Sequence, residues 1–153
     1  DEEAAPSFDE IALSELVKKC VGDFSDIGAG KTIEVSIAPQ IPTRGNPGSL
    51  EQLVLILLDN ALKYSVDSGI IYVKLYESGR KKVIEVINTC PELLDAKPQT
   101  LFDRFYRADT ARTQKNGGYG IGLSIARAVT EAHKGKISAF YDDKHTVRFR
   151  VEL

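Results

Sequence analysis

The sequence predicts an α+β domain, because segments with helical spacing of apolar residues share the chain with short alternating segments that form strand pairs. Three stretches repeat apolar residues at the spacing of one helix face. Two pairs of short stretches, each pair separated by a turn, alternate between apolar and polar side chains. The 153 residues are 42% hydrophobic and 27% charged, which fits one globular domain with a full core. We therefore expect one domain and no second one.

The composition argues against several classes of protein. A formal net charge of -2 gives no electrostatic reason to expect nucleic acid as a partner, since nucleic-acid binders carry a basic face. Cys20 and Cys90 lie far apart without metal-type spacing, so we expect small buried thiols in a reducing cytoplasm. No apolar run approaches the roughly 20 residues of a membrane span and no signal peptide opens the chain. The stretch is expected to be soluble, and it could be a fragment of an anchored protein.

The N-terminal part is expected to hold a tail or linker at residues 1–7, followed by the domain at residues 8–153. Ser14 is the expected cap of a first helix. The apolar face of that helix is marked by Leu13, Leu16, Val17, Cys20, Val21 and Phe24.

Residues 28–32 resemble a phosphate-binding P-loop, but two observations argue against it. Ser25 stands where that motif requires glycine, and the alternating strand pattern of residues 33–37 follows in place of a helix. We expect a turn between a helix and a strand.

The second helix has the clearest helical pattern in the chain. Ser49 and Gln52 have the spacing of a capping box. The expected buried stripe consists of Leu50, Leu53, Val54, Leu57, Leu58, Ala61 and Leu62. Asn60 adjoins this stripe, and Lys63 and Tyr64 follow at i+3 and i+4 on the same side. An amide, an ammonium group and an aromatic ring should therefore meet near the helix end, although an ordinary polar edge is the alternative.

The middle of the chain predicts an antiparallel hairpin. Strands are expected at residues 70–76 and 83–87, joined by a turn at Ser78 and Gly79. Residues 100–106 suggest a short helix with its aromatic side chains on the inner side. Residues 107–118 form a polar loop with three basic residues and one acid, which is either a solvated loop or a cationic lid over an anion.

A glycine-rich run at residues 117–122 leads directly into the third helix. Ile121, Ile125, Val129 and Ala132 have the spacing of one helix face, and the pattern ends at Gly135. Such glycines let the backbone approach a ligand, while free N–H groups and the helix dipole face an anion. A plain turn or hinge is the alternative. Residues 136–141 and 147–153 predict a last hairpin with one solvent-facing side.

Four segments, taken in order, resemble the ATP-binding catalytic domain of sensor histidine kinases. They are residues 60–64, 101–107, 118–126 and 131–137, and the resemblance runs from about Phe8 to Leu153. It implies the Bergerat fold shared with gyrase and MutL, a two-layer α/β sandwich of a mixed, mostly antiparallel sheet with helices on one face. It also implies that ATP lies between the helices under a lid, which we expect to be mobile without nucleotide.

The resemblance implies roles for individual residues. Asn60 corresponds to the Mg²⁺ ligand, Lys63 to a phosphate-contacting lysine and Tyr64 to the ring beside adenine. Phe102 and Phe105 correspond to the aromatic residues that anchor the lid. The implied nucleotide-binding set is Asn60, Lys63, Tyr64, Asn88, Leu93, Phe105, Arg107, Gly118, Gly120, Ile121, Gly122 and Leu123. Of these, the glycines would receive phosphates and Arg107 the terminal phosphate.

The sequence departs from the family pattern at two places. Residues 88–93 align with the first glycine box, where both glycines are absent and Asn88 replaces the aspartate that reads adenine. Cys90 and Glu92 would narrow a wall where bare backbone is usual. Ile56 replaces an asparagine that commonly stands four residues before Asn60. We infer weaker or altered nucleotide binding, with a degenerate regulatory module or another Bergerat-fold ATPase as alternatives.

The two histidines determine what the chain could do alone. Neither His133 nor His145 has the surroundings of a phosphoacceptor, so both are expected to be structural or exposed. The resemblance therefore implies a dimerisation and histidine-phosphotransfer domain upstream, a response regulator, and ATP with Mg²⁺ as cofactors. It further implies a homodimeric parent protein anchored in a bacterial membrane, with this domain in the cytoplasm.

Overall fold

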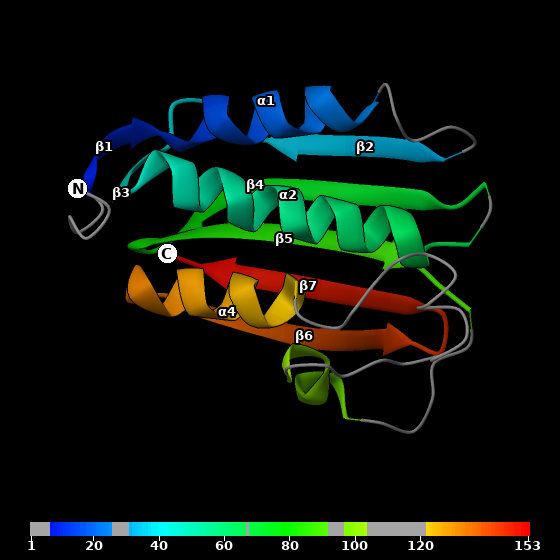
Figure 1. Ribbon diagram of the computed structural model, residues 1–153. Coiled ribbons are helices and arrows are strands. Elements are labelled where there is room, and N and C mark those ends of the chain that lie inside the picture. Colours follow the sequence, from blue (N-terminus) through cyan, green and yellow to red (C-terminus); the bar gives the residue numbers. More distant parts are fainter. Residues whose placement is uncertain (1–6, 26–30, 67, 92–96, 104–121) are drawn as a thin grey trace.

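The computed structural model describes residues 7–25, 31–66, 68–91, 97–103 and 122–153 (Figure 1). In chain order the elements are β1 (Asp9–Ala12), α1 (Leu13–Ser25), β2 (Thr32–Ile37), β3 (Pro42–Gly45), α2 (Pro47–Tyr64), β4 (Ile70–Ser78), β5 (Lys81–Thr89), the 3₁₀-helix η1 (Pro98–Phe102), α4 (Gly122–Ala132), β6 (Lys136–Asp143) and β7 (Thr146–Glu152). Among these helices none is both long and apolar enough to cross a membrane.

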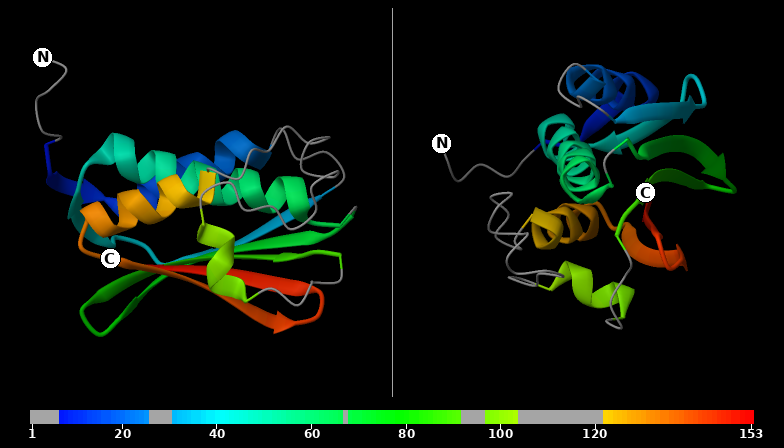
Figure 2. Two further views of the ribbon diagram at one scale, coloured as in Figure 1. Left: turned by 60° about the horizontal axis from the view of Figure 1, so that its bottom comes forward. Right: turned by 90° about the vertical axis from the view of Figure 1, so that its right-hand side faces the viewer.

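A five-stranded sheet forms one layer, and α1, α2 and α4 cover one of its faces (Figure 2). The strand order is β2-β4-β5-β7-β6, and a separate two-stranded sheet pairs β1 with β3. β2 runs parallel to β4, whereas the other neighbours in the large sheet are antiparallel. The predicted α+β class, the mixed sheet and the single helical layer are therefore confirmed.

Both predicted hairpins form. β4 pairs with β5 and β6 with β7, each antiparallel. The first turn lies one residue later than expected, because Ser78 still pairs with Lys81 and the two linking residues are Gly79 and Arg80. Gly79 has a φ of 60°, a conformation that glycine adopts without steric cost.

The core lies between α2 and the central strands. The predicted stripe of α2 is buried at Leu50, Leu53, Val54, Leu57, Leu58 and Ala61, while Leu62 is half-buried. Each fully buried leucine contributes about 1.5–3 kcal/mol. The two cysteines are buried and form no disulfide, as expected, and burial raises the pKa of the Cys20 thiol to about 11.

The start of α2 differs from the expected capping box. Asn46 is the N-cap, and its Oδ1 accepts a hydrogen bond from the main-chain N–H of Ser49 at 2.8 Å. Pro47 follows at the first helical position, where a missing N–H costs nothing. The Ser49 N–H, which the expected capping box would pair with the Gln52 side chain, is thus bound by Asn46.

Ser14 is not the cap of α1, which begins one residue earlier at Leu13. Its hydroxyl group donates to the Ala38 carbonyl at 2.7 Å and accepts from the Ile41 N–H at 2.9 Å. A buried hydroxyl requires such partners. Ser14 therefore joins α1 to the connection between β2 and β3.

Helix α4 is present, but its buried face differs from the predicted apolar one. Ala126 and Thr130 are buried, whereas Ile125 is 37% exposed. The Thr130 hydroxyl donates to the Ala126 carbonyl at 2.8 Å, so burial leaves no unpaired polar group. Small residues on this face suit close packing against α2.

His133 has a structural role at the end of α4. Its Nε2 accepts the main-chain N–H of Asn46 at 3.1 Å, which leaves the proton on Nδ1, 2.8 Å from the Val129 carbonyl. The ring also stacks on Phe8 with centroids 4.6 Å apart. His133 thus connects the end of α4, the cap of α2 and the N-terminal segment, while His145 is exposed.

The sheet face turned away from the helices centres on Glu85, a buried carboxylate of β5. Its oxygens accept hydrogen bonds from Arg148 at 3.1 Å, Arg150 at 2.7 Å and the Tyr76 hydroxyl at 3.1 Å. Burial opposes ionisation, but the hydrogen bond from Arg150 and the charge of Arg148 outweigh it, so the pKa of Glu85 is lowered.

Replacing Glu85 with glutamine should lower the free energy of unfolding by about 1–2 kcal/mol near neutral pH, because two arginines lose their shared carboxylate. Since the folded-state pKa is lowered, this contribution is full above the unfolded value of about 4.3 and is lost as pH falls through the folded value. Urea unfolding should therefore show parent and variant converging in acid. The exposed Glu34→Gln on the same face is the control. Equal stability of parent and Glu85→Gln at neutral pH would show that the network contributes nothing.

Candidate functional site

The predicted binding residues in the described part of the chain lie where three elements begin or end. Asn60, Lys63 and Tyr64 occupy the last two turns of α2, and Asn88 lies next to the end of β5. Gly122 and Leu123 start α4. In Figure 1, α2 and β5 end on the same side of the molecule. The remaining predicted residues, Leu93, Phe105, Arg107, Gly118, Gly120 and Ile121, fall outside the described residues, as does the predicted lid.

Helix α4 begins beside α2. A Cβ atom at Gly122 would lie 3.6 Å from Cγ2 of Ile56, which is ordinary van der Waals contact. Ile56 is one turn before Asn60, so α4 begins beside the middle of α2, about one turn before Asn60. The N–H end of α4 therefore points toward the region next to the last two turns of α2, and the carbonyl end of α2 lies about two turns beyond Ile56.

Lys63 carries its charge at the end of α2. Its Nζ is 3.1 Å from the Asp59 carboxylate one turn earlier, and the two side chains are 34% and 49% exposed. An exposed pair of this kind contributes only about 0.3–0.5 kcal/mol. A phosphate group can therefore replace Asp59 as the partner of Lys63 at small cost. Asn60 and Tyr64 are half-buried next to it.

Asn88 places a buried side-chain acceptor at this end of the molecule. It is 1% exposed and lies on the helix side of β5, with its Nδ2 donating to the Thr89 carbonyl at 3.0 Å. Its Oδ1 is buried without a partner among the described residues. Buried acceptors are normally satisfied, so this oxygen fits a ligand that brings an N–H donor, as the adenine amino group does.

Two further buried hydroxyl groups at this end were not predicted from the sequence. Ser65, which ends α2, and Thr89, which ends β5, each have a side-chain oxygen without a partner among the described residues. The Val66 N–H donates to the Thr89 carbonyl at 3.3 Å and connects the two ends. They could have been recognised in the sequence as short polar residues at the end of a buried helix and at the end of a buried strand.

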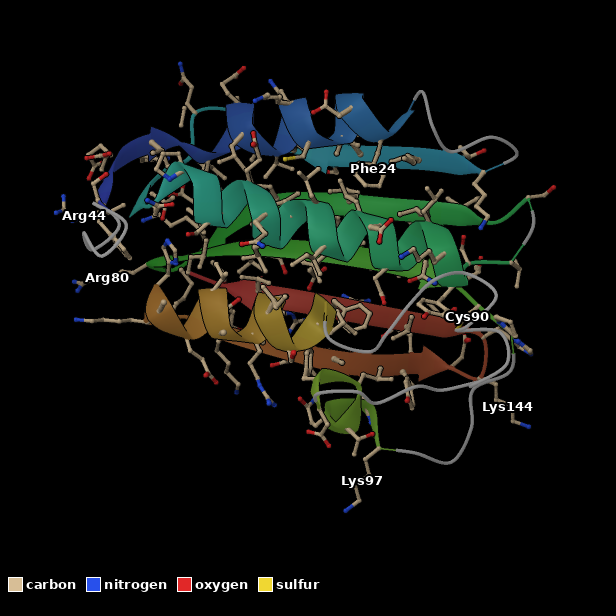
Figure 3. The ribbon with its side chains drawn as sticks, viewed as in Figure 1. Phe24, Arg44, Arg80, Cys90, Lys97 and Lys144 are labelled. Atoms are coloured by element: carbon tan, nitrogen blue, oxygen red, sulfur yellow. The ribbon has the colours of Figure 1, made fainter. Side chains whose placement is uncertain are left out.

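Cys90 occupies the position of the first missing glycine. It lies at the end of β5 (Figure 3), is 5% exposed, and its main-chain N–H donates to the His145 carbonyl at 2.8 Å. Burial raises the pKa of its thiol, which keeps the sulfur neutral. The side chain thus fills buried space that a glycine would leave open, while the expected narrowing of a nucleotide-binding wall stays a prediction. Glu92 lies outside the described residues.

Phe102 points inward, as expected for the aromatic segment, whereas Phe105 and Tyr106 lie outside the described residues. It is 1% exposed and packs edge-on against Phe149 with ring centroids 5.8 Å apart. Gln99 of the same 3₁₀-helix donates to the Ala139 carbonyl at 3.0 Å. The segment expected to anchor the lid is therefore attached to β6 and β7.

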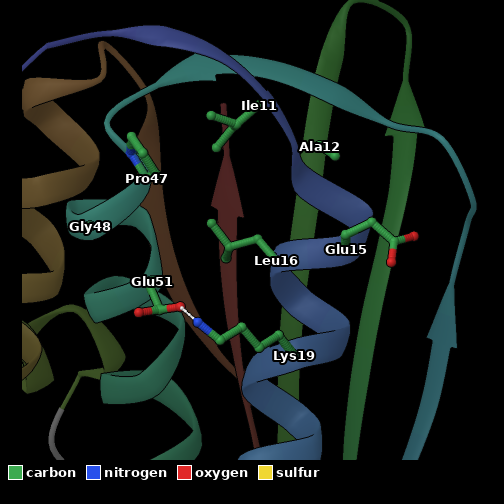
Figure 4. Close-up of a pocket in the computed structure, with 8 residues that line it drawn as sticks. All are labelled: Ile11, Ala12, Glu15, Leu16, Lys19, Pro47, Gly48 and Glu51. Carbon is green, nitrogen blue, oxygen red and sulfur yellow. Dashed lines mark hydrogen bonds and ion pairs between the residues drawn. The ribbon is translucent and has the colours of Figure 1, made fainter.

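A hollow between α1 and α2 is a separate feature (Figure 4). An ion pair between Lys19 and Glu51, 2.9 Å apart, crosses it. Its lining residues are Ile11, Ala12, Glu15, Leu16, Lys19, Pro47, Gly48 and Glu51. They come from β1, α1 and the first half of α2, and they include none of the predicted binding residues. A second hollow continues along α2 as far as Asp59, beside Asn60.

The described residues contain no group of three or more His, Cys, Asp or Glu side chains that could hold a metal. Mg²⁺ does not require one, because it is commonly held by one or two protein oxygens together with substrate phosphates. The amide oxygen of Asn60 is compatible with that arrangement.

Comparison with known proteins identifies the family. Residues 45–153 match the family described as histidine kinase-, DNA gyrase B-, and HSP90-like ATPase. The chain belongs to this ATPase family. DltS, a sensor protein of Streptococcus agalactiae, is 30% identical over 149 residues, which cover 96% of this chain. ArlS, a signal transduction histidine-protein kinase of Staphylococcus aureus, is 40% identical over 105 residues, which cover 69% of this chain. The match spans 37% of DltS and 23% of ArlS.

Solved histidine kinase structures share the fold of this ATPase domain. The mycobacterial sensor histidine kinase MprB has a TM-score of 0.81 at 23% identity, covering 95% of this chain and 96% of that one. The catalytic domain of histidine kinase ThkA has a TM-score of 0.78 at 22% identity, covering 96% and 95%. ThkA in complex with response regulator protein TrrA has a TM-score of 0.75 at 21% identity, covering 95% and 41%. These structures show the fold, and the family match together with the 40% identity to ArlS identifies the chain as an ATPase domain of the histidine kinase type.

Asn88→Asp should increase the preference for ATP over GTP about fivefold, because a charged acceptor strengthens the bond to the adenine amino group and repels guanine O6. Competition of ATP and GTP for a fluorescent nucleotide measures the preference. Asn46→Asp, at the opposite end of α2, changes the same residue type and should leave the ratio unaltered.

The parent should already discriminate weakly, since an amide can present either its oxygen or its nitrogen to the base. A parent that prefers ATP a hundredfold, or an Asn88→Asp variant whose ratio does not move, would mean that another group reads the base.

Proposed function

We propose that this domain binds Mg-ATP between the end of α2 and the start of α4 and donates the γ-phosphate to a histidine on a dimerisation domain outside the chain. The single observation that carries the proposal is the buried Oδ1 of Asn88, which has no hydrogen-bond partner in the described part of the chain and lies where the family resemblance expects the base-reading residue. The lysine and amide at the end of α2 supply the complementary groups for phosphate and metal.

Each described residue has a distinct part in this proposal. Asn60 would offer a neutral oxygen to Mg²⁺, and Lys63 would exchange Asp59 for a phosphate oxygen. The main-chain N–H groups at Gly122 and Leu123 would face phosphate at the positive end of α4. Bound Mg-ATP supplies the transferable phosphoryl group. Outside the described residues, Leu93, Phe105, Arg107, Gly118, Gly120 and Ile121 remain proposed contacts on the family resemblance.

We propose a histidine-phosphotransfer domain and a response regulator as partners. In support, the relatives DltS and ArlS are named as sensor and signal-transduction proteins, and one structure of ThkA contains a response regulator. From the family resemblance alone we also propose a homodimeric, membrane-anchored parent protein with this domain in the cytoplasm.

The isolated chain should bind Mg-ATP but label neither of its histidines. Both ring nitrogens of His133 are engaged with Asn46 and Val129, so no lone pair is available for phosphoryl transfer. Incubation with γ-labelled ATP, with and without an added dimerisation and phosphotransfer domain, tests this expectation. Label should reach the added domain alone. Stoichiometric, acid-labile label on His133 or His145 would contradict the proposal.

Two alternatives give different results in the same assay. A regulatory module that binds nucleotide without transferring phosphate is favoured by the neutral Asn88 and the bulk of Cys90, and it would leave the added domain unlabelled. An ATPase of the gyrase and HSP90 type would release inorganic phosphate steadily without any acceptor.

Asn60→Ala should weaken Mg-dependent nucleotide binding at least tenfold while the melting temperature of the empty protein changes little. Asn60 is half-buried at the edge of the apolar stripe, so its truncation removes a metal ligand and little core volume. Isothermal titration with and without Mg²⁺ measures the first effect. Gln52→Ala, at an exposed position of the same helix, is the control. Unchanged Mg-ATP binding by Asn60→Ala would remove Asn60 from the site.

A further inference from the structure

Lys31 reaches from the start of β2 to the end of α2. Its Nζ donates to the Leu62 carbonyl at 2.5 Å and to the Ser65 carbonyl at 3.2 Å. The last four carbonyls of a helix have no N–H partner within the helix. Lys31 therefore binds carbonyl oxygens that have no N–H partner within α2. It does so from a position 31 residues before Leu62 in the chain.

The position of Lys31 is held by the sheet. The next residue, Thr32, donates its main-chain N–H to the Gly69 carbonyl at 3.1 Å and pairs with Ile70 at the start of β4. Lys31 is half-buried, so its ammonium group is partly shielded from water. The contact consequently connects the end of α2 to the edge strand of the sheet.

This contact acts on the turn that carries the proposed site. Leu62 lies between Asn60 and Lys63, and Ser65 directly follows Tyr64. Helix ends fray unless their last carbonyls are bound, and a frayed last turn would leave Asn60 and Lys63 without a fixed direction. A cation bound to two of these carbonyls keeps the turn helical.

The charge of Lys31 has a second consequence. The C-terminal end of a helix carries a partial negative charge, which disfavours a nearby polyphosphate. At the proposed site α4 presents its favourable N-terminal end, but α2 presents its unfavourable one. A lysine bound to the α2 carbonyls offsets that charge where the phosphates approach Lys63.

We propose that Lys31 is a positioning residue of the nucleotide site, which holds the last turn of α2 and offsets its negative end. The inference rests on the proposed function of the same site. It predicts an effect that grows with the charge of the ligand, because adenosine carries no phosphate whereas ATP carries three. A purely structural role would weaken both ligands equally.

The test compares Mg-ATP and adenosine binding by the parent and by Lys31→Met, which keeps the apolar stem and removes the ammonium group. Titrations are done at a temperature where circular dichroism shows each protein folded. Lys31→Met should weaken Mg-ATP about three- to tenfold and adenosine less than twofold. Lys31→Arg should restore Mg-ATP binding to within about twofold of the parent. Lys19→Met removes the lysine that pairs with Glu51 earlier on α2 and should alter neither affinity.

The outcomes separate this inference from the proposed function. A parent that binds no Mg-ATP overturns both. If the parent binds Mg-ATP, two results for Lys31→Met overturn the role of Lys31 alone. One is Mg-ATP binding equal to that of the parent, and the other is an equal loss of affinity for Mg-ATP and adenosine. If Lys31→Met does not fold, Lys31→Gln, which keeps N–H donors without the charge, takes its place and should show the same selective loss of Mg-ATP.

Discussion

The burial of α2 against the central strands is the constraint on which the rest of the structure depends. Six of its side chains, from Leu50 to Ala61, are buried on the sheet, and this packing leaves α2 no freedom to turn or slide. Asn60, Lys63 and Tyr64 belong to the same helix, so the packing also sets where they lie. Because α2 and β5 end on one side of the molecule, the polar residues at the two ends come together there (Figure 1). The proposed nucleotide site therefore lies where the buried apolar stripe of α2 ends.

The same arrangement brings an electrostatic difficulty that the charged side chains relieve. The region between α2 and α4 borders one helix end that favours an anion and one that opposes it. Lys63 and Lys31 both place positive charge at the opposing end, the first paired with Asp59 and the second with the carbonyls of Leu62 and Ser65. Away from this region, His133 and Glu85 hold the frame: the first joins α4 to the cap of α2, and the second joins β5 to β7.

Sequence reasoning succeeded where the physics is local. The spacing of leucines predicted α2 and its stripe, and i+3 and i+4 spacing put Lys63 and Tyr64 beside Asn60. It failed where a residue's partner lies far along the chain. Nothing near Ser14 or Lys31 indicates the carbonyls that they bind, and the parallel pairing of β2 with β4 joins strands on either side of α2. The predicted buried face of α4 was wrong for another reason, because periodicity favours large apolar residues. The buried residues of α4 are instead Ala126, which is small, and Thr130, whose hydroxyl group bonds to the Ala126 carbonyl of the same helix.

The proposed site is tested by a crystal structure of the domain with Mg²⁺ and a non-hydrolysable ATP analogue. The nucleotide should lie between the end of α2 and the start of α4, with the adenine amino group within hydrogen-bonding distance of Asn88 Oδ1. The metal should bind the Asn60 amide oxygen, and Lys63 should be released from Asp59. Nucleotide bound instead in the hollow between α1 and α2, beside Lys19 and Glu51, would contradict the proposed site. So would a base that lies away from Asn88 while its buried oxygen stays unpaired.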